Sequence, residues 1–396
     1  MDRLNKLELV LYCSFSLFFA GCGATAPPAP VQPSLPQIIN VRDAPYNATG
    51  NGSTDDTAAI QRAVTAAGGT GKTVFVPDGN YRINAIAVTT GGNHGIDLPS
   101  NMTLQLSSNA VLQALPNAVD TSAILWLDGV RNVTITGGTV EGERATHTDT
   151  TGQWGMGISI YDSSSITVDS VTTEDCWGDG LYVGGTVGAQ NLAITNVTSI
   201  GNRRQGMSIT AANGVVVKNS TFKNNSGTSP QSGIDIEPNP GNAVNNVLIS
   251  GNTFSNNGGS GVQSGVPMAN SVTASVTAIV IDSNTFTGNG TDPVDGVDGA
   301  IDISNSSGTQ VTNNIVTGNA SYGILIHQAA NNSVVTGNTI RGTTGMPGNG
   351  IDLDSSSGAT VTGNTSTGNF GYGIYQDACA SCTITGNTLS GNGQTQ

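Results

Sequence analysis

A short phrase recurs from residue 157 to the C-terminus: a glycine, then an apolar, a variable and, in most copies, a second apolar residue. A short apolar segment follows each copy, usually with an Asn-Thr turn after it. The copies begin at Gly157, Gly180, Gly206, Gly233, Gly261, Ala300, Gly323, Gly350 and Gly373. A repeat of about 20–50 residues is typical of solenoids. Because each unit shows strand alternation and no helical pattern, the sequence predicts a solenoid of strands.

The composition is consistent with one long domain of this kind. Of 396 residues, 54 are glycine and only 5% are aromatic, and a solenoid needs only a thin core because each coil buries its face on the next. The formal net charge of −14 argues against nucleic acid and anionic lipid as partners. The Gly-Lys-Thr sequence ending at Thr73 lies between a predicted helix and a predicted strand, the reverse of a phosphate-binding loop, so no nucleotide is expected.

The N-terminal residues read as a targeting segment. The apolar run 7–20 is too short to span a membrane and is typical of a signal peptide. It ends in Phe19-Ala20-Gly21-Cys22, which resembles a bacterial lipobox and implies cleavage before a lipidated Cys22. We therefore expect a lipoprotein signal peptide (1–21), a Pro-rich tether (22–37) and the solenoid domain (38–396). The expected location is the bacterial cell envelope, lipid-anchored at the outer surface or in the periplasm; an ordinary signal peptide with a chance cysteine is the alternative.

A mixed segment precedes the repeats. We expect a strand at 38–41, then a helix with a hydroxyl cap and acidic first turn at 53–56, ending at Gly68-Gly69. Asn40-Val41-Arg42-Asp43, the stretch 52–61 (GSTDDTAAIQ) and the stretch 74–81 (VFVPDGNY) resemble the N-terminal part of the pectate-lyase-like β-helix superfamily. The resemblance covers the chain after residue 37. It implies an all-β, single-stranded right-handed parallel β-helix with a short N-terminal helical cap.

The same resemblance implies a polysaccharide partner, because most members of the superfamily act on polysaccharides. It does not select a reaction, since the superfamily includes lyases, hydrolases, epimerases, phage tailspikes and non-catalytic proteins. The Asn-Thr-Asp and Gly-His-Gly signatures of polygalacturonases are absent from this sequence, as is the Asp-Pro-His-Glu signature of secreted mannuronan epimerases.

Two further patterns concern stability. An Asn follows the second apolar segment of seven coils: Asn219, Asn252, Asn284, Asn314, Asn338, Asn364 and Asn387. Stacked about 4.8 Å apart, these side chains are expected to form an amide ladder. Cys379 and Cys382 are spaced for a small disulfide in an oxidising compartment.

The outer face of the first strand carries the candidate site. In Gly233-Ile234-Asp235-Ile236-Glu237, alternation points the two Ile inward and the two carboxylates outward. The predicted site comprises Asp179, Arg203, Arg204, Asp235, Glu237 and Asp302, and Trp154, Tyr161, Asp179 and Tyr182 are the candidate substrate-binding residues. The alternative is a solvated acidic face, and His327 on this face is interpreted as a solvated side chain.

Two chemistries suit the cluster. In a lyase acting on a uronate-containing polymer, Asp235, Glu237 and Asp302 would hold Ca²⁺. Arg203 or Arg204 would then act as the base or clamp a carboxylate. In a hydrolase, Asp235 and Glu237 would be acid and base, roughly 6.5–7 Å apart at the backbone, the lower edge of the inverting range. A surface-tethered lyase is our first hypothesis. A glycoside hydrolase or epimerase, and a non-catalytic binding or surface-structural protein, stay open.

The lipobox generates a test. We expect metabolic labelling with a fatty acid to mark the wild-type protein in a bacterial host and to leave Cys22→Ser unmarked, because the thiol of Cys22 is the predicted attachment point. A wild-type protein that never takes up the label would contradict the lipoprotein interpretation.

Overall fold

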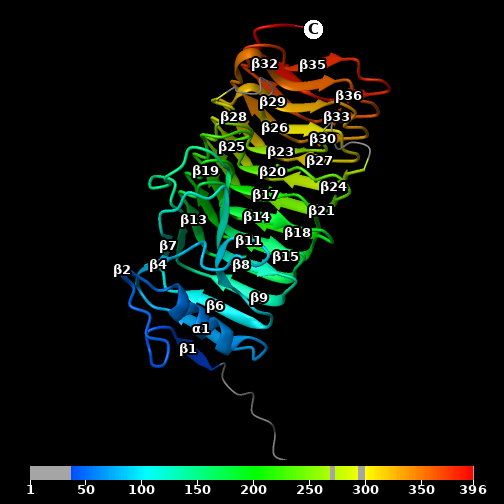
Figure 1. Ribbon diagram of the computed structural model, residues 1–396. Helices are drawn as coiled ribbons and strands as arrows, with labels where there is room; N and C mark the ends of the chain where they lie inside the picture. The colour runs from blue at the N-terminus through cyan, green and yellow to red at the C-terminus, as the bar shows by residue number, and fades with distance from the viewer. Residues whose placement is uncertain (1–36, 268–272, 293–298, 396) are drawn as a thin grey trace, which may run out of the picture. The chain divides into compact units, whose positions relative to one another are not determined.

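Each turn of the chain between the first and the last adds one strand to each of three parallel sheets, called here A, B and C (Figure 1). The computed structural model describes residues 37–267, 273–292 and 299–395. The predicted right-handed parallel β-helix is confirmed. The signal peptide (1–21), Cys22 and the tether up to residue 36 lie outside the described residues, so the lipoprotein interpretation stays a prediction.

Sheet C contains the glycine phrase, and its strands run side by side up the molecule in Figure 1. Its strands are β5 (His94–Asp97), β8 (Thr121–Asp128), β11 (Trp154–Tyr161), β14 (Leu181–Gly184), β17 (Met207–Ile209), β20 (Ile234–Ile236), β23 (Val262–Gly265), β26 (Gly299–Ser304), β29 (Ala320–His327), β32 (Thr344–Asp354) and β35 (Ile374–Asp377).

Sheet A contains the second apolar segment of each coil. Its strands are β1 (Ile38–Asn40), β3 (Thr73–Val76), β6 (Met102–Leu106), β9 (Arg131–Thr136), β12 (Ser164–Asp169), β15 (Ala189–Thr195), β18 (Ala212–Lys218), β21 (Ala243–Ser250), β24 (Ser275–Asp282), β27 (Gln310–Thr312), β30 (Val334–Thr336), β33 (Thr360–Thr362) and β36 (Thr383–Thr385).

Sheet B is made from the segment that the sequence analysis treated only as an Asn-Thr turn. Its strands are β2 (Asn51–Asp55), β4 (Gly79–Ile83), β7 (Ala110–Ala114), β10 (Thr139–Glu141), β13 (Thr172–Glu174), β16 (Thr198–Ile200), β19 (Thr221–Lys223), β22 (Thr253–Ser255), β25 (Thr285–Thr287), β28 (Ile315–Thr317), β31 (Thr339–Arg341), β34 (Thr365–Thr367) and β37 (Thr388–Ser390).

The predicted helix is α1 (Thr57–Ala67), which packs against the first coils at the N-terminal end of the β-helix (Figure 1). The predicted hydroxyl cap and acidic first turn are wrong: Asp56 is the N-cap residue, and the first turn has no acidic residue. The Asp56 carboxylate instead accepts hydrogen bonds from the backbone of Thr49 and Gly50, while Asp55 accepts one from the Thr57 N–H. No helix within the described residues is long and apolar enough to cross a membrane.

The repeat glycine is required by the packing inside each coil. The rings of Phe222, Phe254 and Phe286 stack between neighbouring coils, with centroids 5.3 and 4.8 Å apart. A Cβ on Gly233 would lie 2.7 Å from the Phe254 ring and 2.5 Å from the carbonyl of the next coil, closer than carbon and oxygen contacts allow. Two coils after Gly233, Ala300 occupies the position of the repeat glycine. In that coil the smaller Val316 stands at the buried position that Phe occupies in the preceding coils.

Two amide ladders link the coils at the turns flanking sheet B. In the ladder expected from the sequence, the side-chain amide of each Asn donates to the Oδ1 of the next at 3.0 Å, from Asn252 through to Asn387. Asn219 is not a rung, contrary to our expectation. It is exposed with a φ of 52°, and the N–H of Ser220 contacts the ladder in its place.

The sequence analysis missed the second ladder. It runs along Asn202, Asn225, Asn257, Asn289 and Asn319 with amide-to-oxygen distances of 2.8–3.0 Å and resumes at Asn369 and Asn392. Its sequence signal is an Asn four residues after the first residue of the sheet B strand in these coils. At the C-terminal end, Cys379 and Cys382 form the predicted disulfide.

The ladder generates a stability prediction. Asn284 is almost fully buried and bonds to the coils on both sides. Asn284→Ala would therefore leave several buried partners unsatisfied. We expect a loss of about 3 kcal/mol in the free energy of unfolding, measured by denaturant or thermal unfolding. The matched control is Asn219→Gly, which suits the positive φ and should change stability by less than about 0.5 kcal/mol. Equal effects of the two changes would contradict the assigned ladder.

Candidate functional site

The strand register of sheet C places one outward-facing residue from each coil in a single row. From the N-terminal end the row is Asp97, Trp126, Ser159, Tyr182, Ser208, Asp235, Gln263, Asp302, Leu325, Asp352 and Tyr375. Neighbouring strands lie about 4.8 Å apart. The row therefore joins the predicted residues Tyr182, Asp235 and Asp302 and extends past them.

Arg204 and Asp179 form a buried ion pair beside this row. Their side chains are 12% and 0% exposed, and Nη1 of Arg204 lies 3.1 Å from Oδ2 of Asp179. The Ser208 hydroxyl donates to the same carboxylate oxygen at 2.6 Å. Burial alone would lower the pKa of Arg204, but the charges of Asp179, Asp235 and Glu237 raise it above its ordinary value. The guanidinium therefore stays protonated and cannot serve as a base.

Asp235 is buried rather than solvated, which corrects the prediction that it lies on the surface: it is 1% exposed. The amide of Gln205 donates to its Oδ2 at 2.9 Å, and within the described residues its Oδ1 has no hydrogen-bond partner. Burial raises the pKa of Asp235 well above its usual range, and the charge of Glu237 adds to this.

Asp302 is held by His327 on a strand next to its own. Nε2 of His327 lies 2.8 Å from Oδ1 of Asp302, and both residues are 7% exposed. The interpretation of His327 as a solvated side chain is therefore wrong. Burial acts to lower the pKa of His327, but the hydrogen bond and charge of Asp302 raise it above its usual value. The histidine is thus a proton-bearing partner of Asp302.

Asp235 and Asp302 line the same pocket. Its volume is about 280 Å³, and Asp235, Glu237, Gln263, Asp302 and His327 are among its lining residues. The structure therefore brings together three of the predicted site residues, although not as the solvated acidic face that we had kept as an alternative.

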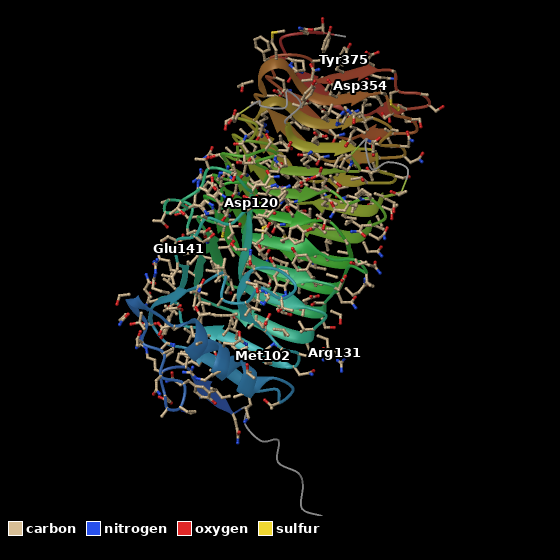
Figure 2. All side chains as sticks on the ribbon, viewed as in Figure 1. Met102, Asp120, Arg131, Glu141, Asp354 and Tyr375 are labelled. Atoms are coloured by element: carbon tan, nitrogen blue, oxygen red, sulfur yellow. A yellow bond between two sulfur atoms is a disulfide. The ribbon has the colours of Figure 1, made fainter. Side chains whose placement is uncertain are left out.

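A second pocket of about 490 Å³ lies further toward the C-terminus and also includes His327 in its wall. Asp352, Asp354, Asp377, Tyr372 and Tyr375 line it, and Figure 2 shows Asp354 and Tyr375 at this end of the molecule. Burial raises the pKa of Asp352 to about 6, and the charges of Asp354 and Asp377 contribute. These carboxylates are not among the site residues expected from the sequence, because their burial is not visible there.

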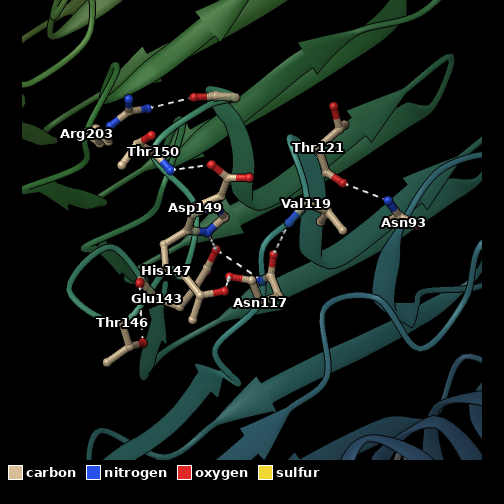
Figure 3. Close-up of polar contacts among 12 residues, drawn as sticks. Asn93, Asn117, Val119, Thr121, Glu143, Thr146, His147, Asp149, Thr150 and Arg203 are labelled. Atoms are coloured by element: carbon tan, nitrogen blue, oxygen red, sulfur yellow. Dashed lines mark hydrogen bonds and ion pairs between the residues drawn. The ribbon is translucent and has the colours of Figure 1, made fainter.

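Arg203 is not part of the carboxylate cluster. Its guanidinium lies 3.8 Å from the ring centre of Trp177 and donates to the Gly152 carbonyl at 2.9 Å, in the loop between β10 and β11 (Figure 3). His147 of the same loop stacks on Trp177 at 3.9 Å and contacts Glu143 (Figure 3). Arg203 therefore anchors a loop, and its assignment as a base or clamp beside Asp235 finds no support in this geometry.

The predicted aromatic residues lie at the N-terminal end of the face. The rings of Trp126, Tyr161 and Tyr182 follow one another with centroids 4.6 and 5.2 Å apart, and the Tyr182 hydroxyl lies 2.9 Å from that of Thr210. Trp154, at the start of β11, is 42% exposed. Because Tyr161 and Tyr182 contact each other's rings, Trp154 has more ring surface available to a ligand than they have.

The calcium prediction lacks a preformed site among the described residues. No group of three or more His, Cys, Asp or Glu side chains there is arranged to hold a metal ion, and this includes the proposed ligands Asp235, Glu237 and Asp302. Calcium binding by these residues remains a prediction.

A family model for right-handed β-helix regions matches residues 74–239 and 241–395. The curated relatives include the uncharacterized protein YclG of Bacillus subtilis, 30% identical over 50% of this chain and 38% of that protein. They also include the mannuronan C5-epimerase AlgE3 of Azotobacter vinelandii, 33% identical over 38% of this chain and 7% of that protein. The matches thus span well under half the length of these relatives.

Solved structures resemble the chain over most of its length. The Streptococcus pneumoniae surface adhesin PfbA has a TM-score of 0.65 at 16% identity, covering 91% of this chain and 99% of that one. A family 28 exopolygalacturonase of Yersinia enterocolitica has a TM-score of 0.65 at 14% identity, covering 91% and 76%. At these identities the likeness shows the fold alone.

The buried Asp352 generates a pH prediction. Its pKa of about 6 exceeds the unfolded value of about 3.9, so the folded protein binds this proton more tightly. Its contribution to stability is therefore fully present below about pH 4 and is lost as the pH rises through 6. Asp352→Asn cannot ionise and should gain about 1–2 kcal/mol over wild type between pH 4 and 7, allowing for partial solvent screening.

The measurement is the free energy of unfolding of both proteins at the two pH values, with the exposed Asp43→Asn as a control that should follow wild type. A difference between Asp352→Asn and wild type that does not change with pH would contradict the raised pKa.

Proposed function

Since the chain belongs to the right-handed β-helix family, we propose that it is a glycoside hydrolase whose polysaccharide substrate lies along the outer face of sheet C. A polysaccharide is supported by the relatives and neighbours named for such substrates, the epimerase and the exopolygalacturonase. The observation that carries the proposal is the placement of two carboxyl groups, the buried Asp235 and the His327-bound Asp302, on the wall of one pocket.

Asp235 has the properties of a general acid. It is buried, its pKa is raised well above the usual range by burial and by Glu237, and its Oδ1 has no other partner among the described residues. It can therefore hold a proton at neutral pH and deliver it to the glycosidic oxygen of a bound sugar. Glu237 contributes through its charge, which adds to the raised pKa of Asp235.

Asp302 has the properties of a general base. His327 contacts one of its oxygens and so fixes the orientation of the carboxylate in the pocket. Asp235 and Asp302 are separated in the row by the single residue Gln263, and two strand spacings amount to about 9.5 Å at the backbone. This is the upper edge of the separation of about 6.5–9.5 Å found in inverting glycosidases, which leaves room for a water molecule activated by Asp302.

The lyase hypothesis has less support. Proton abstraction from a uronate needs a base, and Arg204 is held protonated by its ion pair with Asp179. Arg203 contacts Trp177 and Gly152 instead. The described lining of the pocket includes no Lys or Arg that would neutralise a sugar carboxylate. Hydrolysis needs only the carboxyl pair and water.

The test is turnover of a panel of neutral, anionic and cationic polysaccharides, followed by reducing-end release and by the anomeric configuration of the first product in an NMR spectrum. We expect inversion. Asp235→Asn and Asp302→Asn should each lower kcat by at least about 100-fold, because each removes a proton-transfer group. Their melting temperatures should stay close to wild type, since Asn retains the size and the accepting oxygen of Asp.

The matched control is Glu141→Gln on sheet B, which removes one carboxylate outside the pocket and should retain full turnover. Release of a product absorbing as an unsaturated uronate would overturn hydrolysis in favour of a lyase. Saturable binding of a polysaccharide without any product, in wild type as in the variants, would identify a non-catalytic binding protein.

A further inference from the structure

The pocket lined by Asp235 and Asp302 adjoins the C-terminal pocket. His327 lines both of them, and Asp302 and Asp352 occupy the same row of sheet C with only Leu325 between them. Two spaces of about 280 and 490 Å³ thus lie side by side along the strand-stacking direction. We call the two spaces together the sheet C groove.

The walls of the sheet C groove are acidic. The carboxyl groups that line it are Asp235, Glu237, Asp302, Asp352, Asp354 and Asp377. None of the described residues lining it is Lys or Arg, and the whole chain has a formal net charge of −14. A polymer with a carboxylate on each sugar would be repelled from such a surface.

The carboxylates at the C-terminal end are crowded without being paired to a cation. Asp354 and Asp377 are direct partners on adjacent parallel strands, and like charges at such positions repel. Asp352 is two residues from Asp354 on the same strand and is 5% exposed. Further along the same groove, Oδ1 of Asp235 is buried and has no hydrogen-bond partner within the described residues. Folding gains nothing from the crowding of Asp352, Asp354 and Asp377, whereas a positively charged ligand would relieve it.

Aromatic side chains complete this end of the groove. Tyr372 and Tyr375 lie with ring centroids 5.1 Å apart, and Phe370, also in the wall, is 58% exposed. Exposed rings offer apolar faces to the C–H surface of a sugar ring, and their faces attract an ammonium group. A bare metal ion would not use such a wall, and the described residues provide no group arranged to hold one.

We propose that the sheet C groove takes a cationic polysaccharide, one whose sugars carry protonated amino groups, with the ammonium groups on Asp352, Asp354 and Asp377 and the rings on Tyr375 and Phe370. This proposal rests on the proposed function for the placement of the glycan along sheet C, and it names the substrate class of that site. Asp354 and Asp377 are binding residues here and have no part in the proton transfers assigned to Asp235 and Asp302.

The test is calorimetric binding to the full chain bearing Asp302→Asn, so that the ligand is not cleaved. The probes are a glucosamine oligosaccharide, its fully N-acetylated counterpart of the same length, and an oligogalacturonate. We expect the glucosamine oligosaccharide to bind at least tenfold more tightly than the acetylated one, and its affinity to fall as salt is raised from 20 to 500 mM. Oligogalacturonate should show no binding.

The variant arm adds Asp354→Asn and Asp377→Asn together. Affinity for the glucosamine oligosaccharide should fall roughly tenfold, since each partly exposed charge pair contributes up to about fivefold, while affinity for the acetylated oligosaccharide should not change. The control is the pair Asp43→Asn and Glu141→Gln, which removes the same net charge outside the groove and should leave both affinities as they were.

Equal binding of the amino and N-acetylated oligosaccharides, or tighter binding of oligogalacturonate, would overturn the proposal even if the protein hydrolyses a glycan. Selective binding of the glucosamine oligosaccharide without cleavage by the wild-type protein would overturn the hydrolase and leave the cationic ligand in place. The two proposals therefore fail on different measurements.

Discussion

Every feature of this molecule depends on the registered stacking of one coil on the next. Backbone hydrogen bonds hold parallel strands about 4.8 Å apart, and the Asn ladders fix the register by linking the same position of consecutive turns. The glycine of each phrase lets the next carbonyl and an interior Phe approach closely. Because register is fixed from coil to coil, residues about 25 positions apart in sequence become immediate neighbours, and the row on sheet C is a direct product of this.

The outer row is unusual in how little of it is solvated. Asp235, Asp302 and Asp352 of the row, and Asp179 beside it, are all less than 9% exposed, and burial of a carboxylate disfavours its charged form. Only Asp179 has a guanidinium partner. Burial and the charge of Glu237 raise the pKa of Asp235, and Asp302 is paired with His327. Burial thus affects the two carboxyl groups of the pocket differently, and this difference is the physical basis for proposing Asp235 as the acid and Asp302 as the base.

The β-helix could be predicted from the sequence because the repeated glycine and the alternation of apolar residues each follow directly from strand geometry. Glycine spacing and alternation located sheets A and C, and the entry segment located α1. Sheet B was missed because its strands are three residues long in most coils, too short for alternation to stand out from a turn. Asn219 was included as a rung because a one-residue shift between Asn and Ser220 cannot be seen without the register.

The site was only partly predictable for a different reason. Alternation correctly placed Asp235 and Asp302 on the outer face of sheet C, but it carries no information on what covers that face. Burial of Asp235 and His327 depends on tertiary packing around the pocket, and the orientation of Arg203 depends on the loop that contains His147 and Gly152. Two arginines adjacent in the sequence thus have different partners: Arg204 contacts Asp179, and Arg203 contacts Trp177.

The second ladder has one interruption among its described members. Between Asn319 and Asn369 the corresponding residue is Thr343, whose hydroxyl has no hydrogen-bond partner, and no side-chain amide bond joins it to Asn319. In a linear array, stability is approximately a sum of terms between nearest neighbours, so the array separates most readily where one term is smallest. The coils beyond this seam include β35 and thus Tyr375. The first ladder crosses this position, where Asn314 donates to Asn338, and Thr344 donates to the Asn319 carbonyl. The aromatic end of the groove is therefore attached to the coils of Asp235 without the amide link of the second ladder.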